Sequence, residues 1–250
     1  MFEISASKIT AYMDCPLKYK FRYVDKIEAE ETPAGLAMGS AFHRTLKHYY
    51  NNLVKGQRLN MEEIERTFRE DWEIQQTIPI RWNGDGPDAL EQQGIDLIRT
   101  YLEGVGEVPV PQAVETSFRV PLVNLKTGET AKDIELVGII DRVDNGPVEM
   151  KTSARSWNQL QADQSLQMSM YAYHQALQTK QERIQGRFEV VVKNKAPKLQ
   201  IIDTERSVHD FDRLFRIVKE IVTCIDAEVY YPNPGMFCGG CEFADYCLLW

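Results

Sequence analysis

The stretch that most constrains the fold is residues 134–153, IELVGIIDRVDNGPVEMKTS, which combines two short apolar segments with a turn sequence between them. Apolar runs bounded by Asp-Asn-Gly predict a β-hairpin. A three-residue loop with Gly146 in the left-handed conformation would pair Val143 with Pro147. Pro147 lacks an N–H, which suits an irregular turn edge better than a regular ladder.

The register of this hairpin decides whether two acidic side chains meet. In the three-residue loop, Asp141 lies opposite Glu149. A two-residue Asn-Gly turn would instead pair Asp141 with Met150, on the other face. Lys151 is two positions from Glu149, so the two side chains share a face of the strand. The sequence therefore predicts two carboxylates and an ammonium group that converge on one point.

Carboxylates at this spacing suit a hard cation such as Mg²⁺ or Mn²⁺, which also binds phosphate oxygens. The neighbouring lysine could then orient or activate a water. The simpler interpretation is a surface hairpin with an ordinary ion pair, which contributes little free energy. An Asp…Glu-x-Lys pattern is common by chance, so the choice depends on the rest of the chain.

Composition places the chain among globular proteins. It has 250 residues, 43% of them hydrophobic, and a net charge of −8. This charge argues against bulk electrostatic coating of nucleic acid, although it leaves room for a local basic groove. No apolar run reaches the length of a membrane span, and the first ten residues lack the apolar core of a signal peptide. We therefore expect a cytoplasmic protein without a membrane partner.

Hydrophobic periodicity predicts one α/β domain over residues 1–250, with a mixed central sheet flanked by helices. The expected helices span residues 5–23 (with a break at Cys15), 36–53, 60–76, 88–102, 157–177 and 208–229. The expected strands span residues 113–122, 133–141, 187–193 and 198–204, in addition to the hairpin strands 137–143 and 147–152. Residues 60–106 form a helical insert with no catalytic motif.

Several polar residues outside the hairpin are candidates for a site. Gln164, Gln167 and Tyr171 fall on one helix face, where polar groups meet either solvent or substrate. His43 lies one helical turn after a glycine, although a single helical histidine is more often structural. Glu115 in the strand before the hairpin is a candidate outer-shell acid.

The most basic short segment of this acidic chain is the turn that contains Lys193, Lys195 and Lys198. Such clusters contact phosphates in nucleic-acid-binding proteins, although a solvated turn is the simpler interpretation.

The cysteines are distributed unevenly. Cys238, Cys241 and Cys247 follow one another near the C-terminus, whereas Cys224 belongs to the apolar stripe of a helix. Three thiolates leave one position of a metal site open, and Cys15 is the remaining candidate. The alternatives are a C-terminal zinc knuckle without Cys15 and cysteines that bind no metal. Four thiolates suit either zinc or an iron–sulfur cluster, and the spacing does not choose between them.

Together these motifs resemble the RecB-type branch of the PD-(D/E)xK nuclease superfamily. The resemblance is closest to iron–sulfur members such as CRISPR-associated RecB-like exonucleases and the AddB nuclease domain. In the family's order, the motifs are SASKI before Cys15-Pro16, GSAFH ending at His43, GIID ending at Asp141, VEMK ending at Lys151, Gln167-x3-Tyr171, KNKAP beginning at Lys193, and the terminal cysteines.

The resemblance implies a restriction-endonuclease-like fold and a role for each matching residue. Lys151 would be the catalytic lysine, and Gln167 and Tyr171 would position DNA. The implied ligands of Mg²⁺ or Mn²⁺ are His43, Asp141, Glu149 and the backbone carbonyl of Met150. The implied ligands of a [4Fe–4S] cluster, which would join residues 1–25 to residues 232–250 in a terminal module, are Cys15, Cys238, Cys241 and Cys247.

The expected function is that of a metal-dependent DNA exonuclease or end-processing nuclease acting on single-stranded DNA or duplex ends. A helicase, integrase or recombination protein is the expected type of protein partner. The alternative is a DNA-end-binding or partner-docking subunit with weak nuclease activity and a structural cluster. Intact acidic and lysine positions favour the enzyme.

Overall fold

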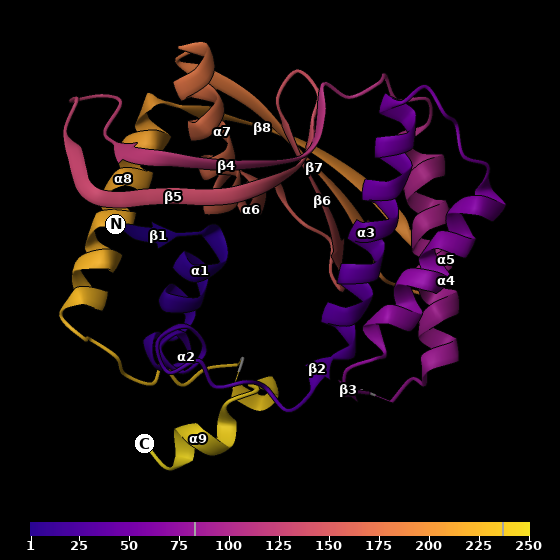
Figure 1. Cartoon of the computed structure of the whole chain (residues 1–250), viewed down its shortest axis with the longest axis horizontal. Coiled ribbons are helices and arrows are strands. Elements are labelled where there is room, and N and C mark those ends of the chain that lie inside the picture. The colour runs from indigo at the N-terminus through magenta and orange to yellow at the C-terminus, as the bar shows by residue number, and fades with distance from the viewer. Residues whose placement is uncertain (83, 237) are drawn as a thin grey trace.

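The computed structural model describes residues 1–82, 84–236 and 238–250, and within these residues six strands form one mixed sheet (Figure 1). The strands are β1 (Phe2–Ile4), β4 (Ala113–Val123), β5 (Thr130–Val143), β6 (Pro147–Ser153), β7 (Arg183–Val192) and β8 (Lys198–Ser207). Their order is β1-β5-β6-β7-β8, and β4 also pairs with β5. The β1–β5 and β6–β7 pairs are parallel and the others antiparallel. The predicted mixed central sheet is confirmed.

Helices cover both faces of this sheet (Figure 1). They are α1 (Ala6–Asp14), α2 (Pro16–Tyr19), the π-helical turn η1 (Lys20–Val24), α3 (Ala34–Val54), α4 (Met61–Gln75), α5 (Pro87–Val105), α6 (Gln159–Asp163), α7 (Leu166–Thr179), α8 (Val208–Asp226), the 3₁₀ turn η2 (Cys238–Gly240) and α9 (Ala244–Leu248). Two short strands, β2 (Thr32–Pro33) and β3 (Ile80–Arg81), pair separately. In the part of the chain that is described, no helix is long and apolar enough to cross a membrane.

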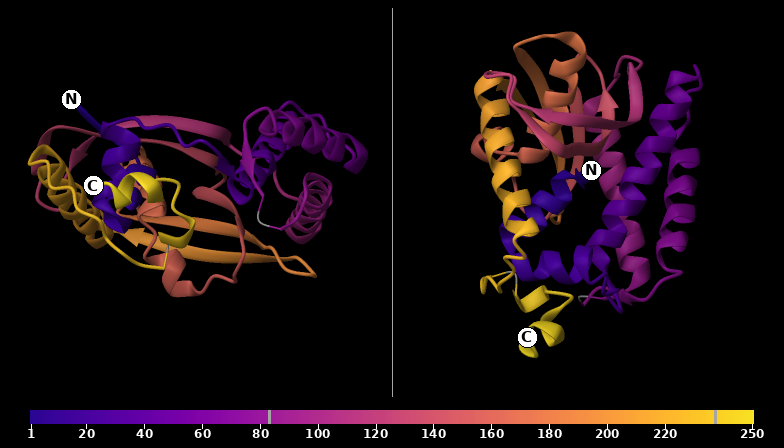
Figure 2. Two further views of the ribbon diagram at one scale, coloured as in Figure 1. Left: turned by 90° about the horizontal axis from the view of Figure 1, so that it is seen from below. Right: turned by 60° about the vertical axis from the view of Figure 1, so that its left-hand side comes forward.

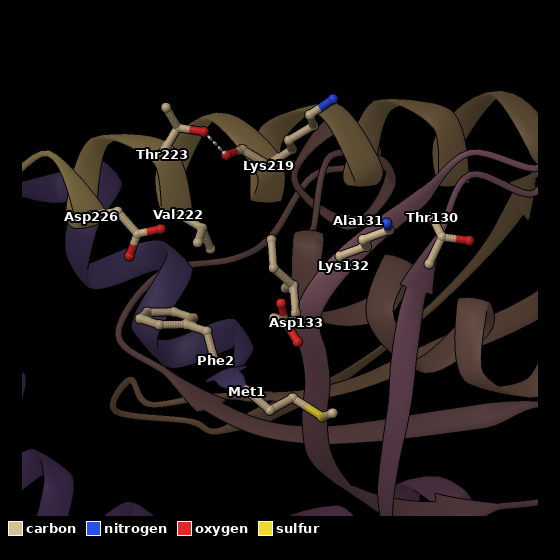
Figure 3. A pocket seen from close by; sticks show the side chains of 11 residues that line it. Met1, Phe2, Thr130, Ala131, Lys132, Asp133, Lys219, Val222, Thr223 and Asp226 are labelled. Carbon is tan, nitrogen blue, oxygen red and sulfur yellow. Dashed lines mark hydrogen bonds between the residues drawn. The ribbon is translucent and has the colours of Figure 1, made fainter.

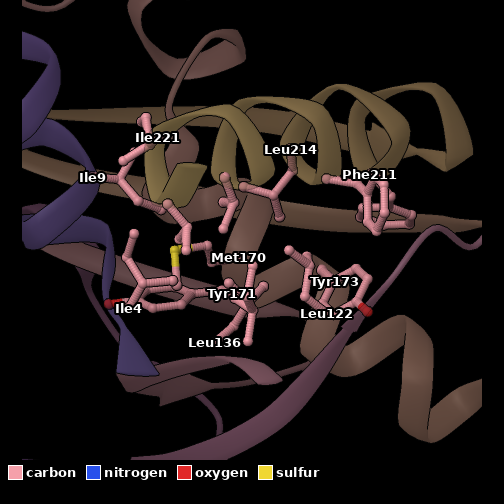
Figure 4. Close-up of a cluster of buried hydrophobic side chains, with 14 of the residues drawn as sticks. Ile4, Ile9, Leu122, Leu136, Met170, Tyr171, Tyr173, Phe211, Leu214 and Ile221 are labelled. Atoms are coloured by element: carbon pink, nitrogen blue, oxygen red, sulfur yellow. The ribbon is translucent and has the colours of Figure 1, made fainter. Parts of the chain in front are cut away.

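Two hydrophobic cores lie on opposite sides of the sheet. The first packs α1, α7 and α8 against β1, β4 and β5, with Met170 and Leu214 among its fully buried members (Figure 4). The second packs α3, α4 and α5 against β6 and β7, around Phe42, Phe68 and Trp72. The views in Figure 2 separate these two groups of helices. The segment 60–106 therefore contributes helices to the main core of one face.

The turn of the central hairpin has the predicted register but a different backbone. Val143 pairs with Pro147 and Arg142 with Val148, as a three-residue loop requires. The prediction that Gly146 is left-handed was wrong, because it is not among the residues with positive φ. A Cβ at this position would lie 1.9 Å from the carbonyl oxygen of Gln185. The glycine is needed for close approach of a neighbouring strand rather than for its dihedral angles.

The helix predicted over residues 157–177 is interrupted. Helix α6 ends at Asp163, and the Ser165 side chain accepts a hydrogen bond from the N–H of Met168 at the start of α7. This serine cap restarts the helix in a new direction. Gln164 is consequently the C-cap of α6 and does not share a helix with Gln167, so the predicted row of three polar residues is reduced to two.

A buried polar network ties the hairpin to the helices behind it. Arg142 is 1% exposed, and its guanidinium donates to both carboxylate oxygens of Glu189 at 2.7 and 3.0 Å. It also donates to Tyr50 of α3 and Tyr101 of α5, whose hydroxyl is 2.5 Å from Glu189. Fully buried charges persist in proteins when they are paired and hydrogen-bonded in this way. The arginine that follows Asp141 therefore anchors the strand that carries it.

Candidate active site

The two acids of the hairpin come from adjacent antiparallel strands. Continuing the observed pairs by one residue places Asp141 of β5 opposite Glu149 of β6. The Oδ2 atom of Asp141 accepts a hydrogen bond from the Met150 N–H at 2.9 Å. This bond fixes the Asp141 carboxylate against the neighbouring strand.

Glu149 is almost completely buried, with 3% of its surface exposed. Its Oε1 atom accepts hydrogen bonds from Lys151 Nζ at 2.7 Å and from Gln167 Nε2 at 2.8 Å. Its Oε2 atom is also buried, and the described residues offer it no hydrogen-bond partner. An unsatisfied buried carboxylate oxygen is costly and is expected where a ligand completes the site.

A chain of hydrogen bonds extends from Lys151 to helix α7. Lys151 Nζ donates to Gln167 Oε1 at 2.8 Å, and Gln167 Nε2 lies 2.8 Å from the hydroxyl of Tyr171. Burial, together with the nearby Glu149 carboxylate, raises the pKa of Tyr171 well above its ordinary value, so its hydroxyl stays protonated. The serine cap of α7 therefore places Gln167 where it can bridge a lysine, a glutamate and a tyrosine.

His43 lies on helix α3 and contacts the acids through Asp141. Its Nδ1 atom is 3.4 Å from Oδ2 of Asp141. Burial lowers the pKa of His43, and the Glu149 carboxylate opposes this shift. The imidazole is therefore neutral at physiological pH, which is the form that binds metal ions.

The electrostatics of this group favour a bound cation. Burial, and next the Glu149 carboxylate, raise the pKa of Asp141 well above its usual value. The buried Glu149 carboxylate, the half-buried Asp141 carboxylate and a neutral imidazole are the donors that Mg²⁺ or Mn²⁺ accepts. Among the described residues, however, no three His, Cys, Asp or Glu side chains form a group that could hold a metal ion as it stands. The residues thus fit a divalent cation by the chemistry of their donor atoms and by the unsatisfied Glu149 oxygen. Their side chains do not yet surround a common point.

The predicted cysteine cluster is brought together only loosely. The N–H of Asn233 lies 3.4 Å from Sγ of Cys15, and the N–H of Gly235 lies 3.3 Å from Sγ of Cys238. Burial raises the pKa of Cys247, and the other three cysteines, Cys15, Cys241 and Cys238, raise it further. Among the described residues, these cysteines do not form a group that could hold a metal ion as they stand. No [4Fe–4S] cluster is therefore supported by the arrangement of the thiols.

The two ends of the chain nevertheless meet beside these cysteines. The N–H of Leu17 donates to the carbonyl of Tyr231 at 3.0 Å, and Arg22 and Lys18 pair with Glu242. Figure 1 shows α9 below α2. Cys224 lies on α8 against the first core, as predicted.

The basic turn lies at the end of the strand that carries Lys151. The N–H of Lys193 donates to the carbonyl of Ser153 at 2.7 Å, two residues beyond Lys151. Lys195 and Lys198 are exposed. The turn therefore extends from the same end of the sheet as the candidate site.

A cavity of about 500 Å³ lies elsewhere, between α8 and the beginnings of β1 and β5 (Figure 3). Its lining includes Phe2, Asp133 and Asp226 and none of the candidate catalytic residues.

Sequence reasoning missed the support behind the site. Tyr101 belongs to the segment 60–106, for which no role was expected, yet its hydroxyl contacts Sδ of Met150 at 3.1 Å as well as Glu189. The available signal was Arg142, a charged residue at a strand position that faces a core.

Comparison with known proteins identifies the class to which this fold and site belong. The model of the PD-(D/E)XK nuclease superfamily matches residues 3–248. The chain belongs to this superfamily, and its mixed sheet flanked by helices is consistent with a restriction-endonuclease-like fold.

Several solved structures are similar to the chain, whereas no curated protein matches it significantly. The crystal structure of a putative exonuclease from Eubacterium rectale is similar, with a TM-score of 0.53 and 13% identity over 99% of this chain and 87% of that one. At this identity the likeness concerns the fold. The structure of SSO0001 aligns with a TM-score of 0.34 and 14% identity over 88% of this chain and 87% of its own, a score too low to bear on the fold.

Proposed function

We propose that the protein is a divalent-metal-dependent deoxyribonuclease that degrades DNA from ends or processes them. The observation that carries this proposal is the buried Glu149, which bonds Lys151 and Gln167 through one oxygen, leaves the other unsatisfied, and faces Asp141. The superfamily match supports nuclease chemistry, and the exonuclease name of the structural neighbour favours action at ends.

The proposed cation ligands are His43, Asp141, Glu149 and the carbonyl of Met150. In an extended strand, the N–H and C=O of one residue point to the same side, so the Met150 N–H bond to Asp141 indicates that its carbonyl also faces that carboxylate. A bound Mg²⁺ or Mn²⁺ would polarise the scissile phosphate and lower the pKa of a coordinated water.

The remaining polar residues would act on substrate and water. The ammonium group of Lys151 can donate to an attacking water or stabilise negative charge that develops on the phosphate. Gln167 holds this ammonium through its carbonyl oxygen while its amide donates to Glu149. Tyr171, protonated throughout the neutral range, can donate its hydroxyl to a DNA phosphate near the site.

Single-stranded DNA or duplex ends are the proposed substrate. The turn formed by Lys193, Lys195 and Lys198 supports this choice because it lies at the same end of the sheet as Lys151. Replacing all three lysines by alanine should weaken DNA binding across sequences and flatten its salt dependence, as expected when phosphate contacts are lost. If the salt dependence of DNA affinity is unchanged in the triple variant, the lysines of the turn face solvent and do not contact DNA.

The nuclease proposal is tested with the purified chain and end-labelled single-stranded DNA, with Mg²⁺ or with a chelator. We expect cleavage that requires the cation and that disappears in Lys151→Ala and Glu149→Ala. Lys219→Ala, which removes an exposed lysine of α8, serves as the control and should cleave normally. DNA-end binding without cation-dependent cleavage would favour the alternative of an end-binding or docking subunit, which acts with a helicase, integrase or recombination protein.

We further propose that Cys15, Cys238, Cys241 and Cys247 hold a structural [4Fe–4S] cluster. Support comes from the terminal segments that carry these cysteines, which meet through the hydrogen bond from Leu17 to Tyr231 and the ion pairs of Glu242 with Lys18 and Arg22. Protein purified without air should contain about four irons per chain. Cys15→Ala should lose them and melt earlier, whereas Cys224→Ala should keep them. Stoichiometric zinc without iron would exclude the cluster.

A further inference from the structure

Glu115 has a backbone conformation that is unusual for its position. It lies inside strand β4 with a φ of 52°, in the left-handed region that residues with a Cβ seldom adopt. Strained residues of this kind persist only where their surroundings hold them, and they are frequent at functional sites. Nothing in the residue type of Glu115 predicts this strain.

The strand pairing places Glu115 beside a candidate metal ligand. Val114 pairs with Arg142 and Thr116 with Ile140, so Glu115 lies opposite Asp141 on the neighbouring strand. The register of the two strands is the same on either side of Glu115, so the pairing continues through the strained residue.

The Glu115 carboxylate also reaches the helix that carries His43. Its Oε2 atom is 3.3 Å from Nζ of Lys47, which lies one helical turn beyond His43 on α3. The side chains of Glu115 and Lys47 are 25% and 48% exposed, so the pair itself adds little to the stability of the fold.

The strand pairing and the ion pair together place the Glu115 carboxylate near both candidate ligands, because Asp141 lies opposite it on β5 and His43 lies one helical turn from its partner Lys47 on α3.

We infer that Glu115 is a positioning residue of the metal site, held in a strained backbone conformation so that its carboxylate stands between Asp141 and α3. There it adds negative charge beside the cation and connects β4, through Lys47, to the helix of His43. This inference rests on the proposed function, since it concerns the same cation.

Mn²⁺ binding measured by titration calorimetry, together with thermal melting of the metal-free protein, tests this role. Glu115→Gln should weaken Mn²⁺ binding by about 10-fold or more, the effect typical of outer-shell partners, with little change in melting temperature. Glu115→Gly should weaken binding equally but melt about 2–4 °C higher, because glycine tolerates a positive φ. A purely structural glutamate would not give this combination.

The matched control is Glu129→Gln, which removes the acid of another exposed Glu–Lys pair, with Lys219, and should change neither quantity. Wild-type Mn²⁺ affinity in Glu115→Gln, or a lower melting temperature in Glu115→Gly, would overturn the inference. Failure of the proposed function would look different: the wild-type protein would bind Mn²⁺ and lose affinity on Glu115→Gln, yet leave DNA uncut.

Discussion

Asp141→Asn should stabilise the metal-free protein while it removes the response to metal. Burial and the Glu149 carboxylate raise the pKa of Asp141 in the folded state. A carboxyl group with a raised folded pKa favours folding below its unfolded pKa, and that contribution is lost as the pH rises through the folded pKa. At neutral pH, which is above the unfolded pKa of an aspartate, this carboxyl group therefore opposes folding. Asparagine removes the charge and can still accept the hydrogen bond from the Met150 N–H.

The expected magnitudes are large enough to measure. Replacing a destabilising side chain at a functional site commonly raises the free energy of unfolding by about 0.5–2 kcal/mol. In a chain of this length each kcal/mol shifts the melting temperature by about 2–4 °C. Mg²⁺ at 100 times its Kd should stabilise the wild-type protein by about 2.7 kcal/mol, and the variant by much less. The variant should thus melt above the wild type without Mg²⁺ and below it with Mg²⁺.

Melting scans at several pH values, with chelator or Mg²⁺, check this reversal. In chelator, the advantage of the variant should shrink as the pH falls through the raised pKa of Asp141. Asp144→Asn is the matched control in the same hairpin: it weakens the ion pair with buried Arg142, at 2.9 Å, and should melt lower with or without Mg²⁺. Two results would refute the reasoning. One is a metal-free Asp141→Asn protein that melts below the metal-free wild type. The other is a variant whose melting temperature rises as much on addition of Mg²⁺ as that of the wild type.

Three further substitutions test how the site is supported. Arg142→Met should cost about 3–5 kcal/mol in unfolding free energy, because it leaves Glu189 buried without its partner, and denaturant titration measures the loss. Gly146→Ala should cost at least about 1–3 kcal/mol in the same assay, since the new methyl group meets a backbone carbonyl; a neutral result would mean that the turn can move aside. Ser165→Ala should lower the free energy of unfolding by about 1 kcal/mol, because it removes the cap of α7. It should also reduce DNA cleavage, because α7 positions Gln167, and unaltered cleavage would show that the cap does not control the position of Gln167.

The sequence predicted the candidate site best where turn length and side-chain alternation lead to the same arrangement. A three-residue turn and a two-residue side-chain period were enough to place Asp141 opposite Glu149 and to put Lys151 on the same face. The bonding of Gln167 to Tyr171 follows from their spacing of four on one helix. These relations involve residues close in the chain or on paired strands, so short-range geometry determines them.

The features that could not be predicted depend on distant parts of the chain. Gly146 is required by a carbonyl of β7, and the positive φ of Glu115 is invisible in its residue type. The end of α6 and the restart at Ser165 needed knowledge of where the chain must turn, because the apolar spacing continues across the break. Apart from Asp144 in the same hairpin, the partners of Arg142 come from α3, α5 and β7, and no local pattern connects them.

The contact of Tyr101 with the buried Arg142–Glu189 pair limits how the protein can be dissected. Residues 60–106 carry none of the family's motifs, so a shortened chain designed from the motifs alone would omit them. Deleting them would remove a hydroxyl that bonds both members of the pair and would open two buried charges to water directly behind the hairpin of the candidate site. A minimal version of this nuclease must therefore retain α5, or replace Arg142 and Glu189 together with apolar residues.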